Sequence, residues 1–208
     1  MRIAIVGTGH IGSTLSRRFV DVGHDVIVSN SRGPDSLSEL VTELGPRATA
    51  ATAAEAVRAG ELIVVSVPLK AVHDVPTEGT AGKVVVDTMN YFPDRDGRFP
   101  EIESGETGSS DLLAEHLGSA RVVKAFNTVV WDRLGEPGKP PGSPNRIALA
   151  ISGDDPDAKA IVSGLVSEIG FEPVDVGSLS DAGRKQQPGG PLFTADLSPD
   201  ELLAAARR

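Results

Sequence analysis

The sequence predicts an α/β fold, a doubly wound and mostly parallel sheet with a small C-terminal α/β part. Three observations support this prediction. Short apolar, β-branched runs alternate with stretches of helical periodicity, which is typical of a parallel sheet with helices on both faces. The first run leads directly into a glycine-rich turn and a helix. A central run, residues 61–68, is apolar almost throughout, as in strands that are buried on both faces.

The first unit runs from a strand over residues 2–6 through Gly-Thr-Gly-His-Ile-Gly into a helix. A G-x-G-x-x-G pattern between a strand and a helix is the dinucleotide fingerprint of the Rossmann fold. Gly7 permits the tight turn, Gly9 lets the backbone approach a pyrophosphate, and Gly12 lets the helix pack closely on the strand. The free N–H groups of the helix N-terminus then face the anion. A glycine turn of purely structural use is the alternative, and the lack of a following Gly-Lys-Ser/Thr excludes a P-loop.

The second strand, residues 25–29, ends without the acidic residue that would accept the ribose hydroxyls of NAD. Asn30, Ser31 and Arg32 stand there instead and offer amide, hydroxyl and guanidinium donors. Such donors suit a 2′-phosphate, so we expect NADP(H) as the cofactor. The alternative is a local turn with a solvated arginine, because Asn-Ser-Arg-Gly-Pro is also a good turn sequence.

The later runs continue the alternation. Ser66, Val67 and Pro68 end the central strand beside the glycine turn, where a nicotinamide ribose would lie, although Pro68 can equally be a simple strand terminator. We expect strands at 49–51, 61–68, 83–87, 121–126, 146–152 and 171–176, and helices at 35–44, up to 57, 111–117, 157–169 and 199–206.

Three long Gly-, Pro-, Ser- and Asp-rich stretches follow strands, at residues 88–110, 127–145 and 177–199. Loops of this length in a compact domain are usually functional or disordered. Ligands bind at the carboxyl ends of parallel strands, so we expect these loops to form a site. We divide the chain into a nucleotide-binding domain, residues 1–126, and a small C-terminal part, residues 127–208, which completes the acceptor site.

Composition excludes several functions. The 208 residues are 39% hydrophobic and carry a net charge of −9, which argues against nucleic acid or anionic lipid as a partner. The chain has no cysteine, and its four histidines lack metal-ligand spacing, so we expect neither disulfides nor a metal site. No apolar stretch is long enough to span a membrane, and no secretion signal is evident. We therefore expect a cytoplasmic protein.

Candidates for a proton donor are few. No Tyr-x-x-x-Lys pair is present, and Tyr91 falls in no recognisable donor arrangement. We expect Lys70 to be a solvated loop residue and Lys124 to have a cross-strand surface role. No side chain is therefore assigned as a catalytic acid or base, which fits hydride transfer to a ring that takes its proton from solvent.

Several motifs together resemble the NADPH-dependent deazaflavin reductases, the coenzyme F420-dependent NADP oxidoreductases. The resemblance runs in order over nearly the whole chain and extends to the reductase domain of the STEAP metalloreductases, which passes hydride from NADPH to a flavin. It is carried by Gly-Thr-Gly-His-Ile-Gly, Asn-Ser-Arg-Gly-Pro, Ser-Val-Pro, Val-Val-Lys-Ala-Phe-Asn-Thr-Val, Gly-Asp-Asp and Val-Asp-Val-Gly-Ser-Leu-Ser.

The resemblance implies roles for individual residues. Thr8, His10 and Ile11 would flank the pyrophosphate, Asn30, Ser31 and Arg32 the 2′-phosphate, and Val67 and Pro68 the nicotinamide. Phe126, Asn127 and Val129 would line the deazaflavin pocket, with Ala125 beside them on the cofactor side.

Two features depart from the family pattern. Asn127 stands where the archaeal enzymes have His, and the polar run 184–191 replaces an apolar C-terminal helix. Both changes fall on the acceptor side, so they leave NADP binding intact and the acceptor open.

The sequence thus predicts an NADP(H)-dependent oxidoreductase that moves hydride between NADPH and a deazaflavin (coenzyme F420) or a flavin. One alternative is an NADPH-dependent reductase of a small imine or carbonyl substrate. Those enzymes resemble this chain in the first domain only, and 208 residues leave no room for the all-helical domain that follows it in them. The other alternative is a non-catalytic NADP-binding sensor module. The resemblance also implies a homodimer.

Overall fold

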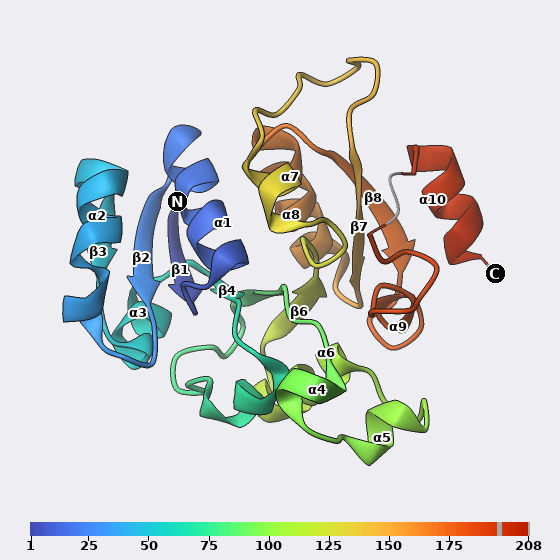
Figure 1. Cartoon of the computed structure of the whole chain (residues 1–208), viewed down its shortest axis with the longest axis horizontal. Coiled ribbons are helices and arrows are strands. Elements are labelled where there is room, and N and C mark those ends of the chain that lie inside the picture. Colours follow the sequence, from blue (N-terminus) through green and yellow to red (C-terminus); the bar gives the residue numbers. More distant parts are fainter. Residues whose placement is uncertain (195–196, 208) are drawn as a thin grey trace.

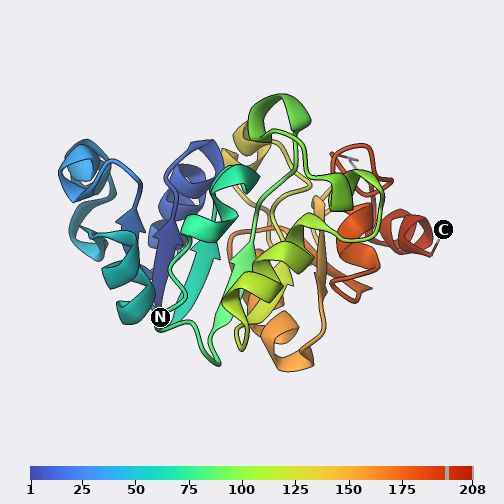
Figure 2. The same ribbon diagram turned by 90° about the horizontal axis from the view of Figure 1, so that it is seen from below.

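A computed structural model of the chain describes residues 1–194 and 197–207 and has one eight-stranded sheet at its centre. The strands lie in the order β3-β2-β1-β4-β5-β6-β7-β8. Figures 1 and 2 both show the N-terminal units at one end of this sheet and the C-terminal elements at the other. The predicted doubly wound sheet is confirmed, because the strand order reverses between β1 and β4.

The first six strands are parallel to one another. They also agree in place with the predicted runs, although several are shorter, because pairing stops where the chain turns into the loops. Their bounds are β1 (Arg2–Val6), β2 (Asp25–Ser29), β3 (Ala48–Ala50), β4 (Leu62–Val65), β5 (Val84–Asp87) and β6 (Arg121–Lys124).

Two large apolar cores cover the two faces of the sheet, and a third, smaller one contains Ala148, Val174 and Leu202. Along β1, Ile3 and Ile5 face one core, and Ala4 and Val6 face the other, as the two-residue period of a strand requires. The first core is completed by α1 (His10–Asp21), α2 (Ser38–Leu44) and α8 (Pro156–Glu168). The second is completed by α3 (Ala53–Ala59), the 3₁₀ helix η3 (Leu69–Asp74) and α6 (Ser109–Leu117).

The predicted helix over 35–44 is divided. Pro34–Leu37 forms the 3₁₀ helix η1, and α2 begins only at Ser38. Gly33 has a φ of 90° immediately before Pro34, so the chain enters the helical region through a turn that delays the first α-helical hydrogen bond. A further 3₁₀ turn, η2 (Gly45–Arg47), leads into β3.

The three long loops contain short helices. The stretch 88–110 holds α4 (Pro93–Asp96) and α5 (Pro100–Glu103), while α7 (Trp131–Gly135) and α9 (Ala182–Lys185) lie in the other two. Prolines at the first turns of α4 and α5 fix φ where a helix N-terminus needs it. The terminal helix α10 (Pro199–Ala206) has the predicted bounds and begins at a Ser198/Glu201 capping box.

The last two strands run in the opposite direction to the first six. β7 (Ala148–Gly153) pairs antiparallel with β6 through Lys124 and Ser152, and β8 (Glu172–Gly177) is parallel to β7. The overlap involves only the ends of β6 and β7, so the carboxyl ends of β7 and β8 lie beside the carboxyl end of β6. The loop after β8 therefore returns to the same edge of the sheet as the loops after β5 and β6.

The boundary expected near Phe126 falls just after β6, and the sheet continues across it. Within residues 1–194 and 197–207, no helix is long and apolar enough to cross a lipid bilayer.

Candidate functional site

The glycine turn joins β1 to α1 through contacts that exclude larger side chains. Gly7 has a φ of 99°, and a Cβ placed on it would lie 2.3 Å from the Ser66 carbonyl oxygen. A Cβ on Gly12 would lie 1.9 Å from the carbonyl oxygen of Gly7. Both glycines are thus required for the close packing of α1 against the ends of β1 and β4.

Gly9 differs from these two glycines. A Cβ placed on it would meet nothing within 4 Å, and it is the N-cap of α1 with no side chain capping the helix. Because the first N–H groups of a helix need partners, this uncapped N-terminus is suited to an anion. The first turn of α1 also carries no acidic residue that would oppose one.

A cavity of about 370 Å³ opens beside this turn. Three segments at the carboxyl edge of the sheet contribute to it, together with Ala53 and residues of η3. They are the glycine turn (Gly7, Thr8 and Gly9), the loop after β2 (Asn30, Ser31 and Arg32) and the end of β4 (Ser66, Val67 and Pro68).

The loop after β2 forms a local turn and also presents donors to the cavity. The Asn30 Oδ1 accepts a hydrogen bond from the Arg32 backbone N–H at 2.9 Å, so Asn30 does form a local turn. Ser31 and Arg32 are exposed at the cavity, and Arg32 makes no ion pair with any described residue. The carboxylate among the lining residues, Asp74, belongs to η3 after β4 and not to the end of β2. This end of the cavity therefore offers a hydroxyl and a guanidinium where an NAD site has a carboxylate.

The other predicted cofactor residues lie outside the cavity lining. The exposed His10 ring stacks on Trp131, with centroids 4.7 Å apart and planes 20° apart. Ile11 packs against the first core, Gly12 supports the turn, and Ala125 is fully buried. The pair of His10 and Trp131 brings α7 next to the glycine turn, a contact that sequence periodicity does not reveal.

The three predicted acceptor residues follow β6 and are largely buried. Phe126 has a φ of 63°, and its ring lies in the core, edge-on to Phe19 at 6.2 Å. Asn127 and Val129 are 2% and 8% exposed. The Phe126 ring therefore anchors the loop, and any part it has in an acceptor site comes through the backbone that it holds.

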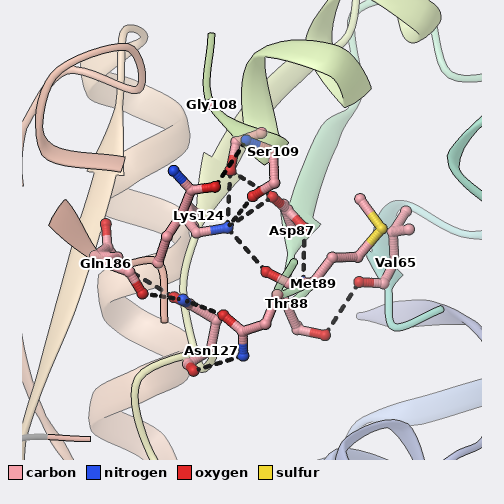
Figure 3. Close-up of polar contacts among 12 residues, drawn as sticks. Val65, Asp87, Thr88, Met89, Gly108, Ser109, Lys124, Asn127 and Gln186 are labelled. Carbon is pink, nitrogen blue, oxygen red and sulfur yellow. Dashed lines mark hydrogen bonds and ion pairs between the residues drawn. The ribbon is translucent and has the colours of Figure 1, made fainter. Parts of the chain in front are cut away.

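The expectation of a surface role for Lys124 is wrong. Its side chain is completely buried and forms an ion pair with Asp87, with Nζ 3.1 Å from Oδ2 (Figure 3). Nζ also donates to the Met89 carbonyl and to the hydroxyls of Ser109 and Ser110. Asp87 and Lys124 are register partners on β5 and β6, so the two charges meet once the strand order is known.

A second polar cluster, formed by Asn90, Asn127, Ser152 and Gln186, lies beside the ion pair. These side chains come from the loops after β5, β6 and β8 and from β7. Sequence motifs single out only Asn127 by itself and Gln186 as part of the polar run 184–191, because no local pattern links residues that are far apart in the sequence.

Tyr91 is occupied within its own loop. Its single O–H has two acceptors within reach, Glu103 Oε1 at 2.8 Å and the Gly97 carbonyl at 3.1 Å, and its oxygen accepts from the Phe99 N–H at 3.2 Å. Burial raises the pKa of the Tyr91 phenol, and the hydrogen bond to Glu103 raises that pKa further. The Tyr91 hydroxyl and the buried Lys124 ammonium thus both have hydrogen-bond partners within the protein. No group of metal-ligating side chains occurs in the part of the chain that the structure describes.

Comparison with known proteins places these features in a family. Residues 2–91 match the family model of the coenzyme F420-dependent NADP oxidoreductases. The metalloreductase STEAP3 of Rattus norvegicus is 32% identical over 184 residues, which are 87% of this chain and 35% of STEAP3. A solved structure of a proposed F420-dependent NADP reductase from Arthrobacter sp. FB24 is 28% identical, covers 86% of both chains and has a TM-score of 0.73.

Residues 2–91 thus match the family of coenzyme F420-dependent NADP oxidoreductases, and the likeness to the Arthrobacter structure extends over 86% of the chain. The chain spans about a third of the length of STEAP3. A hypothetical protein from Sinorhizobium meliloti is 33% identical, with 95% of both chains covered and a TM-score of 0.81, so the fold is shared over almost the entire chain. An imine reductase from Aspergillus terreus, 21% identical with a TM-score of 0.62, shares the fold over 85% of this chain and 55% of its own.

A variant of the glycine turn separates nucleotide binding from folding. Gly9→Val places a side chain in open space at the expected pyrophosphate position, so the fold should persist while NADPH affinity falls. If two hydrogen bonds to the phosphates are lost, at about 1.5–3 kcal/mol each, the affinity for NADPH should fall by about 100-fold or more. Titration calorimetry measures the affinity, and Gly164→Val, at an exposed and equally open position on α8, is the control. Near-native NADPH binding by Gly9→Val would show that the turn is only structural.

The buried ion pair makes a prediction about stability. Lys124→Met leaves the Asp87 carboxylate buried without its cation, so the free energy of unfolding should fall by about 3–5 kcal/mol. Adding Asp87→Asn removes that charge and keeps an acceptor for the Met89 N–H, so the double variant should be more stable than Lys124→Met alone. Denaturant titration measures both. A double variant less stable than the single one would contradict the pairing.

Proposed function

We propose that this chain transfers hydride between NADPH and a deazaflavin (coenzyme F420) or a flavin. The observation that carries the proposal is the cavity between the glycine turn, the donors at Ser31 and Arg32, and the end of β4. In this proposal the glycine turn holds the pyrophosphate and the loop after β2 holds the 2′-phosphate. Val67 and Pro68 then lie toward the nicotinamide, where β4 ends next to Gly7.

The environment of the candidate acids supports a ring as the acceptor. Reduction of a carbonyl needs a proton donor to the developing alkoxide. The Lys124 ammonium is hydrogen-bonded to four buried acceptors, and the Tyr91 hydroxyl is hydrogen-bonded within its own loop. A ring that accepts hydride can take its proton from solvent, so the protein has only to position two rings and exclude water. The metalloreductase name of STEAP3 and the name of the family are consistent with such an acceptor.

The experiment that tests the proposal compares acceptors. Purified protein is mixed with NADPH and, in separate reactions, with a deazaflavin, a flavin and a cyclic imine, and the loss of NADPH absorbance is followed. We expect turnover with at least one of the two ring cofactors and none with the imine. Turnover with the imine alone would favour the small-substrate reductase that the imine reductase fold suggests. Tight NADPH binding without turnover of any acceptor would favour a sensor module.

The preference for NADPH over NADH depends on Arg32. Losing a charge-assisted bond to phosphate costs about 1.5–3 kcal/mol, so Arg32→Ala should weaken NADPH binding by roughly 10- to 150-fold. NADH binding should stay within about twofold, because NADH lacks the 2′-phosphate that this guanidinium is proposed to bind. Calorimetry with NADPH and with NADH measures the ratio of the two dissociation constants in each variant. Arg58→Ala, which removes the same charge from α3, is the matched control, and equal losses for both cofactors would refute the assignment.

We also propose a homodimer in a cytoplasmic, reducing environment. The absence of cysteine from the sequence supports the environment. Sedimentation velocity measures the oligomeric state directly.

A further inference from the structure

The side-chain amide of Asn127 joins three loops. Its Nδ2 donates to the Asn90 Oδ1 at 3.0 Å and to the Gln186 backbone carbonyl at 2.8 Å. Its Oδ1 accepts from the Gln186 Nε2 at 3.2 Å. Asn90 follows β5, Asn127 follows β6, and Gln186 lies in the segment after β8, 59 residues further along the chain from Asn127. Both donors of this amide are therefore used within the protein (Figure 3).

Gln186 is the complementary half of this contact. Its side chain is fully buried, with Nε2 donating to Asn127 and to the Ala150 carbonyl, and with Oε1 accepting from the Ser152 hydroxyl at 2.6 Å. An amide so buried is costly unless every group is paired, and here every polar atom of the side chain has a partner. Asn127 and Gln186 thus determine each other's position.

The buried ion pair fixes the third member of the cluster. Lys124 Nζ donates to the Met89 carbonyl at 2.9 Å, and the Asp87 Oδ1 accepts from the Met89 N–H at 2.7 Å. Both polar groups of the Met89 backbone are held, so the next residue, Asn90, is presented to Asn127 in one orientation. The Asn90 Nδ2 then donates to the Asn127 carbonyl at 3.0 Å.

The segment 186–194 is attached to the loop after β6 at both of its ends. Gln186 bonds to Asn127 at one end, and the Thr194 N–H donates to the Thr128 carbonyl at 3.0 Å at the other. Between them, Phe193 packs on Phe92 of the loop after β5, with centroids 6.4 Å apart. The segment therefore lies across the loop after β5 and the loop after β6, and the second of these contains the proposed acceptor residues Phe126, Asn127 and Val129.

We propose that Asn127 and Gln186 are positioning residues that hold the segment 186–194 in place and so determine which ring acceptors fit. The inference rests on the proposed function for the identity of the acceptor. Neither side chain acts as an acid or base, because the polar atoms of both amides are hydrogen-bonded within the contact between the loops. The Lys124 and Asp87 pair supports the contact from behind.

The test is a double-mutant cycle of Asn127→Ala, Gln186→Ala and the two together, with three measurements. Amide hydrogen exchange of residues 187–194 should accelerate by about tenfold or more in each single variant, with no comparable further gain in the double variant, because both remove the bond between Gln186 Nε2 and Asn127 Oδ1. The KM for the ring acceptor should rise by about tenfold with kcat within about threefold. The Kd for NADPH should stay within about twofold, since the cavity is lined by other residues.

Two further variants complete the experiment. Gln186→Glu keeps the volume but removes both Nε2 hydrogens, so it should give the same result even if Gln186→Ala does not fold. Ser167→Ala removes a hydrogen bond to Arg146 in the same β7–β8 half but away from the cluster, and it should change none of the three measurements. Unchanged exchange in 187–194, or an unchanged KM in a folded variant, would overturn the proposal. If the wild-type protein reduces neither ring, the proposed function fails, and the exchange measurement still decides whether the contact holds the segment.

Discussion

Two opposite charges are buried without access to solvent at the ends of the central strands β5 and β6, and the loops around them are arranged to satisfy these charges. The Lys124 ammonium has three N–H donors, and the protein provides acceptors for them at Asp87, the Met89 carbonyl and the hydroxyls of Ser109 and Ser110. The two serines begin α6, so the start of that helix is fixed by the same pair. Removing such ions from water is expensive, and only complete pairing makes it tolerable. The path of the chain from 87 to 110 follows from this requirement.

The reversal of β7 and β8 has a related consequence. In a sheet with eight parallel strands, the segment after β8 would leave the carboxyl edge at the far end, well away from β6. Here β7 meets β6 only at the ends of the two strands, which brings Ser152 beside Lys124 and Gly177 beside Ser152. Gln186 can therefore reach both Ser152 and Asn127. The proposed acceptor side is formed by loops of both strand directions, whereas the cavity beside the glycine turn uses parallel strands alone.

The range of the contacts explains how much the sequence could predict. The glycine turn depends on neighbours a few residues apart and on backbone geometry, so Gly7, Gly9 and Gly12 could be assigned from spacing, and all eight strands could be placed from apolar runs. Lys124 was misjudged because a lysine in an apolar strand has no visible partner until the register of β5 and β6 places Asp87 beside it. The role of Gln186 could not be predicted beyond its place in the polar run 184–191, because its partners lie 34 to 59 residues away and its surroundings have the composition of a loop.

Contacts between residues far apart in the sequence also connect the two departures from the family pattern. Asn127 and the polar run 184–191 appear independent in the sequence, yet in the structure the Asn127 amide and Gln186, within that run, are bonded to each other through both a side-chain and a backbone contact. An amide at 127 without the Gln186 side chain would leave the buried Asn127 Oδ1 without its donor, at a cost of about 1–3 kcal/mol. The two residues therefore depend on each other, and both lie on the proposed acceptor side. The cavity beside the glycine turn contains neither residue, so the nucleotide site can remain that of the family while the acceptor side takes a different shape.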